Sequence, residues 1–261
     1  MQLNGARILL TGATGGLGQA LAHQLASNGA ALLLAGRDHG RLAAVSLLPA
    51  GTHRTVCADL TRPEGIAATA GAAREFGVNL LINNAGISCF GLYEQQDWSA
   101  IADVLAANLE APMRLTHALL PTLKAAPSGM IVNIGSTFGS LPFPGFAAYS
   151  AAKAGLRGFS QALRRELADT RVSVIHVAPR AIDTPLNSPA VNALNQALKN
   201  RCDSAAAVAS QVIDAIDQDR QESHLGFPEK LFAWLNGLAP ALIDRGLAGK
   251  LATIKSFAPT R

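Results

Sequence analysis

A tyrosine and a lysine four residues apart are the first candidates for chemistry in this sequence. Tyr149 and Lys153 lie near the start of a predicted helix, Ala147–Asp169, where this spacing places both side chains on one face. A free tyrosine has a pKa of about 10, and a neighbouring ammonium group stabilises the phenolate and lowers that pKa. The pair can therefore act as a general acid/base. The same spacing also fits a packed tyrosine beside a solvated lysine.

A glycine-rich turn follows the first apolar run, Ile8–Leu10, and leads into a predicted helix. Glycines in such a turn let the backbone approach a pyrophosphate, and the helix N-terminus offers that anion free N–H groups. The segment fits two glycine spacings, Gly-x-x-x-Gly-x-Gly and Gly-x-x-Gly-x-x-Gly, because two adjacent glycines are present. The turn predicts a dinucleotide site whose members are Gly12, Thr14, Gly15, Gly16, Leu17 and Gly18.

The end of the second predicted strand, Ala31–Ala35, bears on which dinucleotide binds. An NAD site places an acidic residue there, for the ribose hydroxyls. This chain has Gly36 and then Arg37, whose guanidinium suits a 2′-phosphate. The sequence therefore predicts a preference for NADP(H). NAD(H) stays an alternative, since Arg37 also fits a solvated residue at a strand end. The next residue, Asp38, is predicted to cap a helix.

Short apolar runs alternate with helical patterns along the chain, and this alternation predicts a parallel sheet. The runs are continuously apolar, which indicates that helices cover both faces. We therefore expect a doubly wound α/β (Rossmann) fold in a single domain, 1–261, with a cofactor-binding and catalytic core over residues 1–186. The predicted strands are Ile8–Leu10, Ala31–Ala35, Thr55–Ala58, Leu80–Asn83, Met130–Ile134 and Val172–Val177.

The pattern changes after Pro179. Residues 183–200 are predicted to form a loop with a short helix, followed by a helix at Ala205–Ile216 and a last short strand at Ser223–Phe227. The tail, residues 228–261, is predicted to form two amphipathic helices broken at Gly237 and Pro240. An amphipathic pair can cap a substrate cleft, extend an oligomer interface or lie on a membrane. We expect this tail to pack beside the substrate opening.

Composition narrows the class of protein. Hydrophobic residues make up 49% of the 261 residues and charged residues 15%, and the net charge of +4 comes from dispersed rather than clustered lysines and arginines. Nucleic acid is therefore not an expected partner. The three cysteines and six histidines show no metal-ligand spacing, so no metal is expected. The chain has no apolar run of about 18 residues and no evident signal peptide, so we expect a cytoplasmic protein.

Together, these motifs resemble those of the short-chain dehydrogenase/reductase family, over roughly residues 5–186. The resemblance favours the single-domain subclass over the longer sugar-nucleotide epimerases and settles the glycine spacing. It also implies a homodimer or homotetramer, paired through the long helices Asp97–Lys124 and Ala147–Asp169. The residues that carry it are Thr11–Gly18, Asp59, Asn83-Asn84-Ala85-Gly86, Asn108, Ser136 and Tyr149-x-x-x-Lys153.

The resemblance also implies roles for single residues. Tyr149 would exchange a proton with the substrate oxygen, while Lys153 would hold the nicotinamide ribose and lower the Tyr149 pKa. Ser136 would hydrogen-bond the substrate carbonyl, and Asn108 would anchor a water molecule in the proton relay. Further cofactor contacts would come from Arg37, Asp59, Leu60, Asn84, Ala85, Gly86, Pro179, Ile182 and Thr184.

One position departs from the family pattern. The family usually has Pro-Gly after the sixth strand, whereas this chain has Pro179-Arg180. The change alters the backbone beside the nicotinamide and can place a cation at the mouth of the site. Phe138, Phe143 and Phe146 fit either an apolar substrate pocket or simple loop packing. The predicted function is NADP(H)-dependent hydride transfer to or from an apolar carbonyl or secondary alcohol. The alternative is a non-catalytic dinucleotide-binding sensor or scaffold with the same fold.

Overall fold

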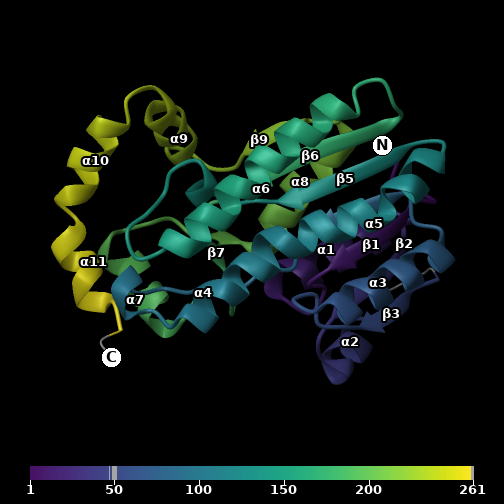
Figure 1. The fold of residues 1–261 in the computed structure, drawn as a ribbon, viewed down its shortest axis with the longest axis horizontal. Coiled ribbons are helices and arrows are strands. Elements are labelled where there is room, and N and C mark those ends of the chain that lie inside the picture. Colours follow the sequence, from purple (N-terminus) through teal and green to yellow (C-terminus); the bar gives the residue numbers. More distant parts are fainter. Residues whose placement is uncertain (47, 49–51, 260–261) are drawn as a thin grey trace.

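A computed structural model describes residues 1–46, 48 and 52–259, and in them a parallel sheet forms the centre of the molecule (Figure 1). The sheet has seven strands in the order β3-β2-β1-β4-β5-β6-β9. Chain order reverses between β1 and β4, the position where doubly wound folds bind their ligands. The strands are β1 (Arg7–Thr11), β2 (Ala31–Gly36), β3 (Arg54–Cys57), β4 (Leu80–Asn83), β5 (Gly129–Ile134), β6 (Val172–Ala178) and β9 (Glu222–His224).

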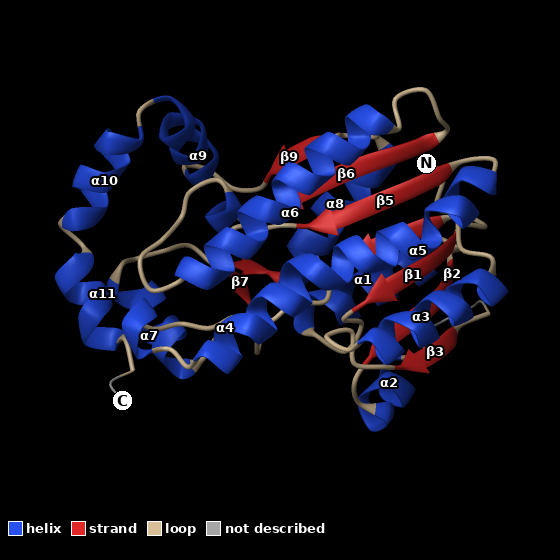
Figure 2. Cartoon of the chain, in the orientation of Figure 1, coloured by secondary structure: helices blue, strands red, loops and turns tan. Residues whose placement is uncertain are grey.

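Helices cover both faces of the sheet, as the apolar strands predict (Figure 2). On one face, α1 (Gly16–Ser27), α2 (His39–Val45) and α8 (Ala205–Asp217) contribute leucine, valine and isoleucine to a core beneath the strands. On the other face, α3 (Pro63–Phe76), α5 (Ala111–Ala125) and α6 (Ala147–Glu166) bury a second apolar core. The predicted α/β fold is confirmed.

The long helix predicted at Asp97–Lys124 has an irregular middle. It consists of α4 (Trp98–Leu105), a π-helical turn η2 (Ala106–Glu110) and α5. The wider turn occurs at Asn108, a candidate catalytic residue whose side chain is fully buried. Short π-helical insertions of this kind are frequent at functional sites.

The segment after β6 contains several short elements beyond the carboxyl ends of the strands. Strands β7 (Ile182–Asp183) and β8 (Asp203–Ser204) pair with each other, and α7 (Pro189–Ala197) is the short helix predicted in the 183–200 loop. The last strand of the sheet, β9, begins one residue earlier than predicted and ends three residues sooner. Two single-turn 3-10 helices, η1 (Tyr93–Gln95) and η3 (Thr137–Gly139), lie in the loops that follow β4 and β5.

The prediction of two tail helices is wrong, because the described tail contains three: α9 (Glu229–Leu238), α10 (Pro240–Ala248) and α11 (Leu251–Phe257). The break at Pro240 is present, since proline fits the first turn of a helix but not its interior. Gly237 does not interrupt α9, and an unpredicted break follows at Gly249. The tail curves away from β9 and returns to α7, so that it arches over one end of the sheet (Figures 1 and 2).

Candidate active site

The carboxyl ends of the strands open onto a cavity of about 1130 Å³. The glycine turn after β1 lies at one end of this cavity, and the tail helices close the other. Every site residue predicted from the sequence contributes to its wall, although these residues span positions 12 to 184. The topology brings them together because the carboxyl ends of parallel strands lie along one edge of a sheet.

The glycine turn is shaped by close backbone contacts. Gly12 has a φ of +65°, and a Cβ atom there would lie 2.7 Å from the Ala85 Cα. At the first residue of α1, a Cβ on Gly16 would lie 2.7 Å from Thr184 Cγ2. Side chains at these two positions would collide with Ala85 and Thr184, so glycine lets the turn pack closely beside the N-terminus of α1, whose free N–H groups suit a phosphate. The turn therefore fits a dinucleotide phosphate.

Hydrogen bonds hold the turn after β4 against the glycine turn. The Thr11 hydroxyl accepts bonds from the backbone N–H groups of Asn84 and Ala85, at 2.9 and 3.0 Å. The Asn84 amide in return donates to the carbonyl oxygens of Thr11 and Gly12. The Asn-Asn-Ala-Gly segment thus fixes the position of the phosphate-binding backbone.

The adenosine end of the cavity is positively charged. Arg37 follows β2, and the predicted cap at Asp38 is present, since its carboxylate accepts a 2.8 Å bond from the Arg41 backbone N–H. The same Arg41 lines the cavity and donates through Nη2 to the Thr14 carbonyl oxygen at 2.7 Å. Our sequence analysis missed Arg41. Its place in the first turn of a capped helix just after Arg37 was the available signal.

Asp59 lines the same end of the cavity and lies near Arg37. Hydrogen bonds from the Thr61 backbone N–H and hydroxyl lower the pKa of the Asp59 carboxyl, and Arg37 lowers it further. The carboxylate is therefore charged at neutral pH and can accept bonds from an adenine or a ribose.

Tyr149 and Lys153 share one face of α6, with the Lys153 Nζ 5.7 Å from the centroid of the tyrosine ring. This Nζ donates a 2.8 Å bond to the Ile134 carbonyl oxygen at the end of β5. Burial lowers the pKa of Lys153 to about 8. Burial also raises the pKa of Tyr149 to about 12, against the opposing effect of a hydrogen bond with Ser136.

The direction of the tyrosine shift corrects a prediction. We expected the lysine to lower the Tyr149 pKa, but removing the phenolate from water raises it by more than nearby groups lower it. In this structure Tyr149 is thus a protonated phenol at neutral pH, hydrogen-bonded to Ser136. The Ser136 hydroxyl also accepts a 3.2 Å bond from the backbone N–H of Phe138.

Asn108 has one satisfied end and one free acceptor. Its Nδ2 donates to the carbonyl oxygens of Ile87 and Val104, at 2.8 and 2.9 Å. Its Oδ1 is buried without a hydrogen-bond partner among the described residues. Buried polar atoms are normally paired, often with ordered water. The free oxygen fits the water-anchoring role that the family resemblance implies.

Aromatic rings surround the tyrosine. Phe138 stacks on Phe143 with ring centroids 5.3 Å apart and meets Tyr149 edge-on at 6.4 Å. Phe146 also lies 6.4 Å from the Tyr149 ring. All three phenylalanines line the cavity, so they pack against one another and also form its apolar wall.

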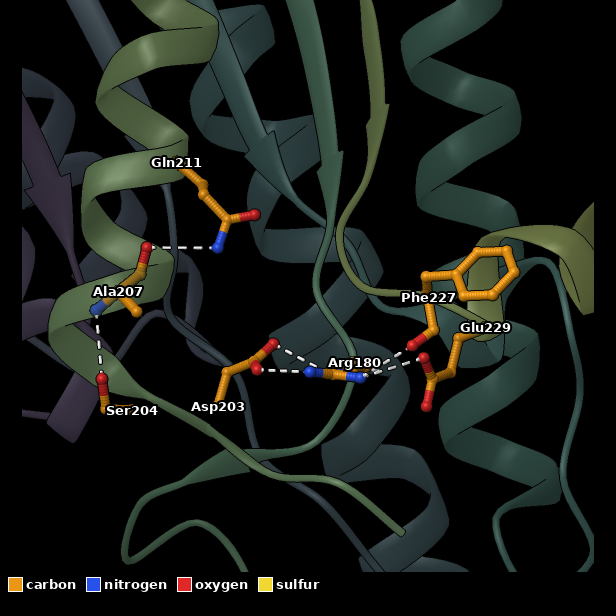
Figure 3. A network of polar contacts seen from close by, with 7 residues as sticks. All are labelled: Arg180, Asp203, Ser204, Ala207, Gln211, Phe227 and Glu229. Carbon is orange, nitrogen blue, oxygen red and sulfur yellow. Dashed lines mark hydrogen bonds and ion pairs between the residues drawn. The ribbon is translucent and has the colours of Figure 1, made fainter.

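Arg180 occupies the position where the family pattern has glycine, and it lines the cavity as the sequence suggested. It is not a free cation, because its guanidinium pairs with Asp203 at 2.6 Å and with Glu229 at 3.2 Å (Figure 3). Among all the residues that the structure describes, no group of three or more histidines, cysteines or acidic residues could hold a metal ion.

Comparison with known proteins now identifies the family, since a family model described as short chain dehydrogenase matches residues 6–195. The chain belongs to the short-chain dehydrogenase/reductase family. As a member it is an oxidoreductase that acts on the CH–OH group of donors with NAD(P) as acceptor. This short-chain dehydrogenase/reductase is 35% identical to mouse dehydrogenase/reductase SDR family member 7B, over 95% of this chain and 82% of the relative. It is 36% identical to the Vibrio cholerae 3-oxoacyl-[acyl-carrier-protein] reductase FabG, over 71% and 77% of the two chains.

Solved structures agree with this assignment. A Burkholderia phymatum short-chain dehydrogenase/reductase in complex with NAD has a TM-score of 0.84 and 26% identity, covering 93% of this chain and 96% of that one. A Burkholderia cenocepacia short-chain dehydrogenase in complex with NADP has a TM-score of 0.81 and 26% identity, covering 95% and 99%. A nicotinamide dinucleotide is therefore the cofactor of this fold. In the part of the chain that the structure describes, no helix is long and apolar enough to cross a bilayer.

Proposed function

We propose that the enzyme is an NADP(H)-dependent reductase or dehydrogenase whose substrate is an apolar ketone, aldehyde or secondary alcohol. The observation that carries this proposal is the position of Tyr149. Its protonated hydroxyl bonds to Ser136 where the glycine-turn end of the cavity meets its aromatic wall. A proton donor is thus available between a phosphate-binding turn and an apolar chamber.

The reaction needs one hydride and one proton, and a bound nicotinamide would supply or accept the hydride at the carbon that bears the substrate oxygen. In the reductive direction, Ser136 hydrogen-bonds the carbonyl oxygen and Tyr149 gives that oxygen its proton. In the oxidative direction, the tyrosine phenolate takes the proton of the alcohol. Lys153 would hold the nicotinamide ribose, and the free Oδ1 of Asn108 would anchor a water that returns protons to the site.

The preference for NADP(H) is supported by two cations and a missing acid. Arg37 and Arg41 both border the adenosine end of the cavity, and Gly36 occupies the strand end where an NAD site has an acidic residue. A guanidinium fork matches the geometry of a phosphate group. The two arginines can therefore bind the 2′-phosphate together.

The apolar character of the substrate is supported by the wall beyond Tyr149. Besides the phenylalanines, side chains from α7 and from the tail helices α9 and α10 line this part of the cavity. A ligand site enclosed by such residues favours an apolar molecule with few polar groups. The apolar residues on this wall are Val191 and Leu194 of α7, its C-cap residue Leu198, and the tail residues Phe232, Leu235, Leu242, Ile243 and Leu247.

Replacement of the tyrosine tests the proposal directly. In a Tyr149→Phe variant, NADPH-dependent reduction of a panel of apolar ketones and aldehydes should fall by at least about 100-fold, because the transferable proton is gone. The NADPH dissociation constant, measured by fluorescence titration, should stay unchanged. Lys153→Ala should weaken both turnover and NADPH binding, since the ammonium also holds the cofactor.

Tyr93→Phe provides the control, because Tyr93 is 57% exposed and does not line the cavity. This variant should keep full activity. A Tyr149→Phe enzyme that retains more than a few per cent of wild-type turnover would exclude the tyrosine as the proton donor. If the wild-type enzyme binds NADPH and reduces no carbonyl compound, the non-catalytic alternative replaces the proposal.

A further inference from the structure

Arg180 joins three segments that are far apart in the sequence (Figure 3). It lies two residues after the end of β6 and binds Asp203 through two parallel bonds, Nε to Oδ2 at 2.9 Å and Nη2 to Oδ1 at 2.6 Å. Its remaining nitrogen, Nη1, donates to Glu229 Oε2 at 3.2 Å. Asp203 belongs to β8, and Glu229 is the first residue of α9 in the tail.

The backbone near Arg180 is shaped to receive this side chain. Gly226 has a φ of +94°, and a Cβ atom there would lie 2.7 Å from the Arg180 Cδ. The Phe227 carbonyl oxygen accepts a further bond from Nη1 at 3.4 Å. The turn that leads into α9 therefore folds around the arginine, and a side chain larger than hydrogen at position 226 would displace it.

The ion pairs of Arg180 with Asp203 and Glu229 are partly shielded from solvent. The exposed fractions of the Arg180, Asp203 and Glu229 side chains are 13%, 19% and 24%. Exposed ion pairs contribute little, but a bidentate arginine–carboxylate pair in a partly buried site is stronger and better defined in geometry. Asp203 fixes the orientation of the guanidinium, which leaves Nη1 directed at Glu229.

The partner on the tail side belongs to a helix that forms part of the substrate chamber. Phe232 and Leu235 of α9 line the cavity, and Asn236 on the same helix donates a 3.0 Å bond to the Ser140 carbonyl oxygen. Helix α9 is thus attached at its first turn through Glu229 and near its end through Asn236. Arg180 itself lies next to Pro179, a predicted contact of the nicotinamide.

We propose that Arg180 is a positioning residue that fastens α9 over the apolar chamber through Glu229, with Asp203 holding the guanidinium in place. The Arg180–Glu229 ion pair links the position of α9 to the segment around Pro179, which is predicted to contact the nicotinamide. Glycine at position 180, the usual residue of the family, cannot make this connection. The effect on substrate affinity rests on the proposed function, whereas the fastening of the tail does not.

Hydrogen exchange of the full-length protein tests the fastening without any substrate. In Glu229→Gln, the backbone amides of α9 and α10 should exchange about tenfold faster, because the charged hydrogen bond to Arg180 is reduced to a neutral acceptor. In Arg180→Gly they should exchange at least as fast, because the bonds to Asp203 and Phe227 are lost as well. Arg180→Lys should give an intermediate rate, because an ammonium keeps the charge but not the fork. Amides in α1 and α5 should be unaffected and serve as an internal reference.

Charge-matched controls separate the contact from the change in net charge. Arg220→Gln removes a cation whose side chain bonds to Gln218 and does not line the cavity. Asp244→Asn removes an acid from α10 that is not a partner of Arg180. Both variants should exchange as the wild type does. The double variant Arg180→Gly/Glu229→Gln should exchange no faster than Arg180→Gly, because Arg180→Gly already removes the contact with Glu229.

Steady-state kinetics tests the consequence for substrate. Glu229→Gln should raise KM for apolar carbonyl substrates by about fivefold to tenfold, with a smaller change in kcat and an unchanged Kd for NADPH. Unchanged exchange in α9 for both Arg180→Gly and Glu229→Gln would overturn the proposal. Faster exchange with an unchanged KM would overturn its substrate part. A wild-type protein without carbonyl reductase activity would refute the proposed function, while the exchange rates would still decide the fastening.

Discussion

The pKa values of Tyr149 and Lys153 shift in opposite directions from their ordinary values. Burial raises the pKa of the phenol to about 12 and lowers the pKa of the ammonium to about 8. Both shifts favour the neutral form, as desolvation requires. His176, fully buried in β6, follows the same rule, since burial lowers its pKa to about 3 and keeps it neutral. The proton donor for reduction is therefore ready at physiological pH.

These directions predict the pH dependence of reduction. The reaction needs protonated Tyr149, present below pH about 12, and charged Lys153, present below pH about 8. The kcat/KM for carbonyl reduction should be level at neutral pH and decline above pH about 8, by up to tenfold per pH unit, as Lys153 loses its charge. A pH–rate profile at saturating NADPH measures this limb. A decline that begins on the acid side of neutrality would show that another group controls the rate.

Arg37 and Arg41 determine the prediction for cofactor choice. We expect kcat/KM with NADPH to exceed that with NADH by at least about tenfold, or about 1.4 kcal/mol. Arg37→Ala and Arg41→Ala should each reduce this ratio, and should leave the NADH value nearly unchanged because NADH lacks the 2′-phosphate. Arg220→Ala is a suitable control, because Arg220 is an exposed arginine that bonds to Gln218 and does not line the cavity. Equal efficiencies with the two cofactors in the wild type would contradict the assignment.

At the scale of secondary structure, the tail helices determine the shape of the substrate chamber. Helix α9 has two kinds of apolar residue: Leu235 faces the cavity, whereas Leu238 is 66% exposed and does not line it. Trp234 is 63% exposed on the same helix. The helix therefore offers a matched pair of leucines for testing whether its inner face contacts substrate.

Leu235→Asp should raise KM for apolar substrates by about tenfold. Leu235 is partly buried, so an apolar substrate that covers it gains part of the roughly 1.5–3 kcal/mol of a fully buried leucine, and a carboxylate adds a desolvation penalty. Leu238→Asp makes the same chemical change on the outer face and should leave KM near the wild-type value. NADPH affinity should be unchanged in both variants. Equal effects of the two substitutions would mean that α9 does not contact the substrate.

At the scale of the whole molecule, the helical segment α4–η2–α5 and the helix α6 suggest how two copies of the chain associate. The face formed by α4, η2, α5 and α6 carries exposed apolar side chains, among them Trp98 at 68% and Met113 at 41% exposure. We expect a homodimer or homotetramer that pairs through these helices. Light scattering at micromolar concentration should give a multiple of 27.0 kDa. A monomeric mass would refute this expectation.

The sequence alone determined the fold class and most of the site. Local patterns suffice for these, because apolar runs bounded by turns define the strands. The glycine turn, Asn-Asn-Ala-Gly and Ser136 lie at or just after strand ends, and Tyr149-x-x-x-Lys153 lies on one face of a helix. Parallel topology then brings the strand ends together. The break at Pro240 was also readable, because proline restricts the backbone in any context.

Only the tertiary structure decided the properties that depend on partners distant in the sequence. The Tyr149 pKa shifts upward because the packed site removes the phenol from water. The four-residue spacing of Tyr149 and Lys153 does not reveal how deeply the two side chains are buried. The partners of Arg180 lie 23 and 49 residues away, in β8 and α9. Arg41 joins the cofactor site through a bond to Thr14 across the cavity rim. The Tyr149 environment and the Arg180 contacts depend on how helices pack against the sheet, which no local pattern encodes, whereas the place of Arg41 in a capped helix after Arg37 was a local signal.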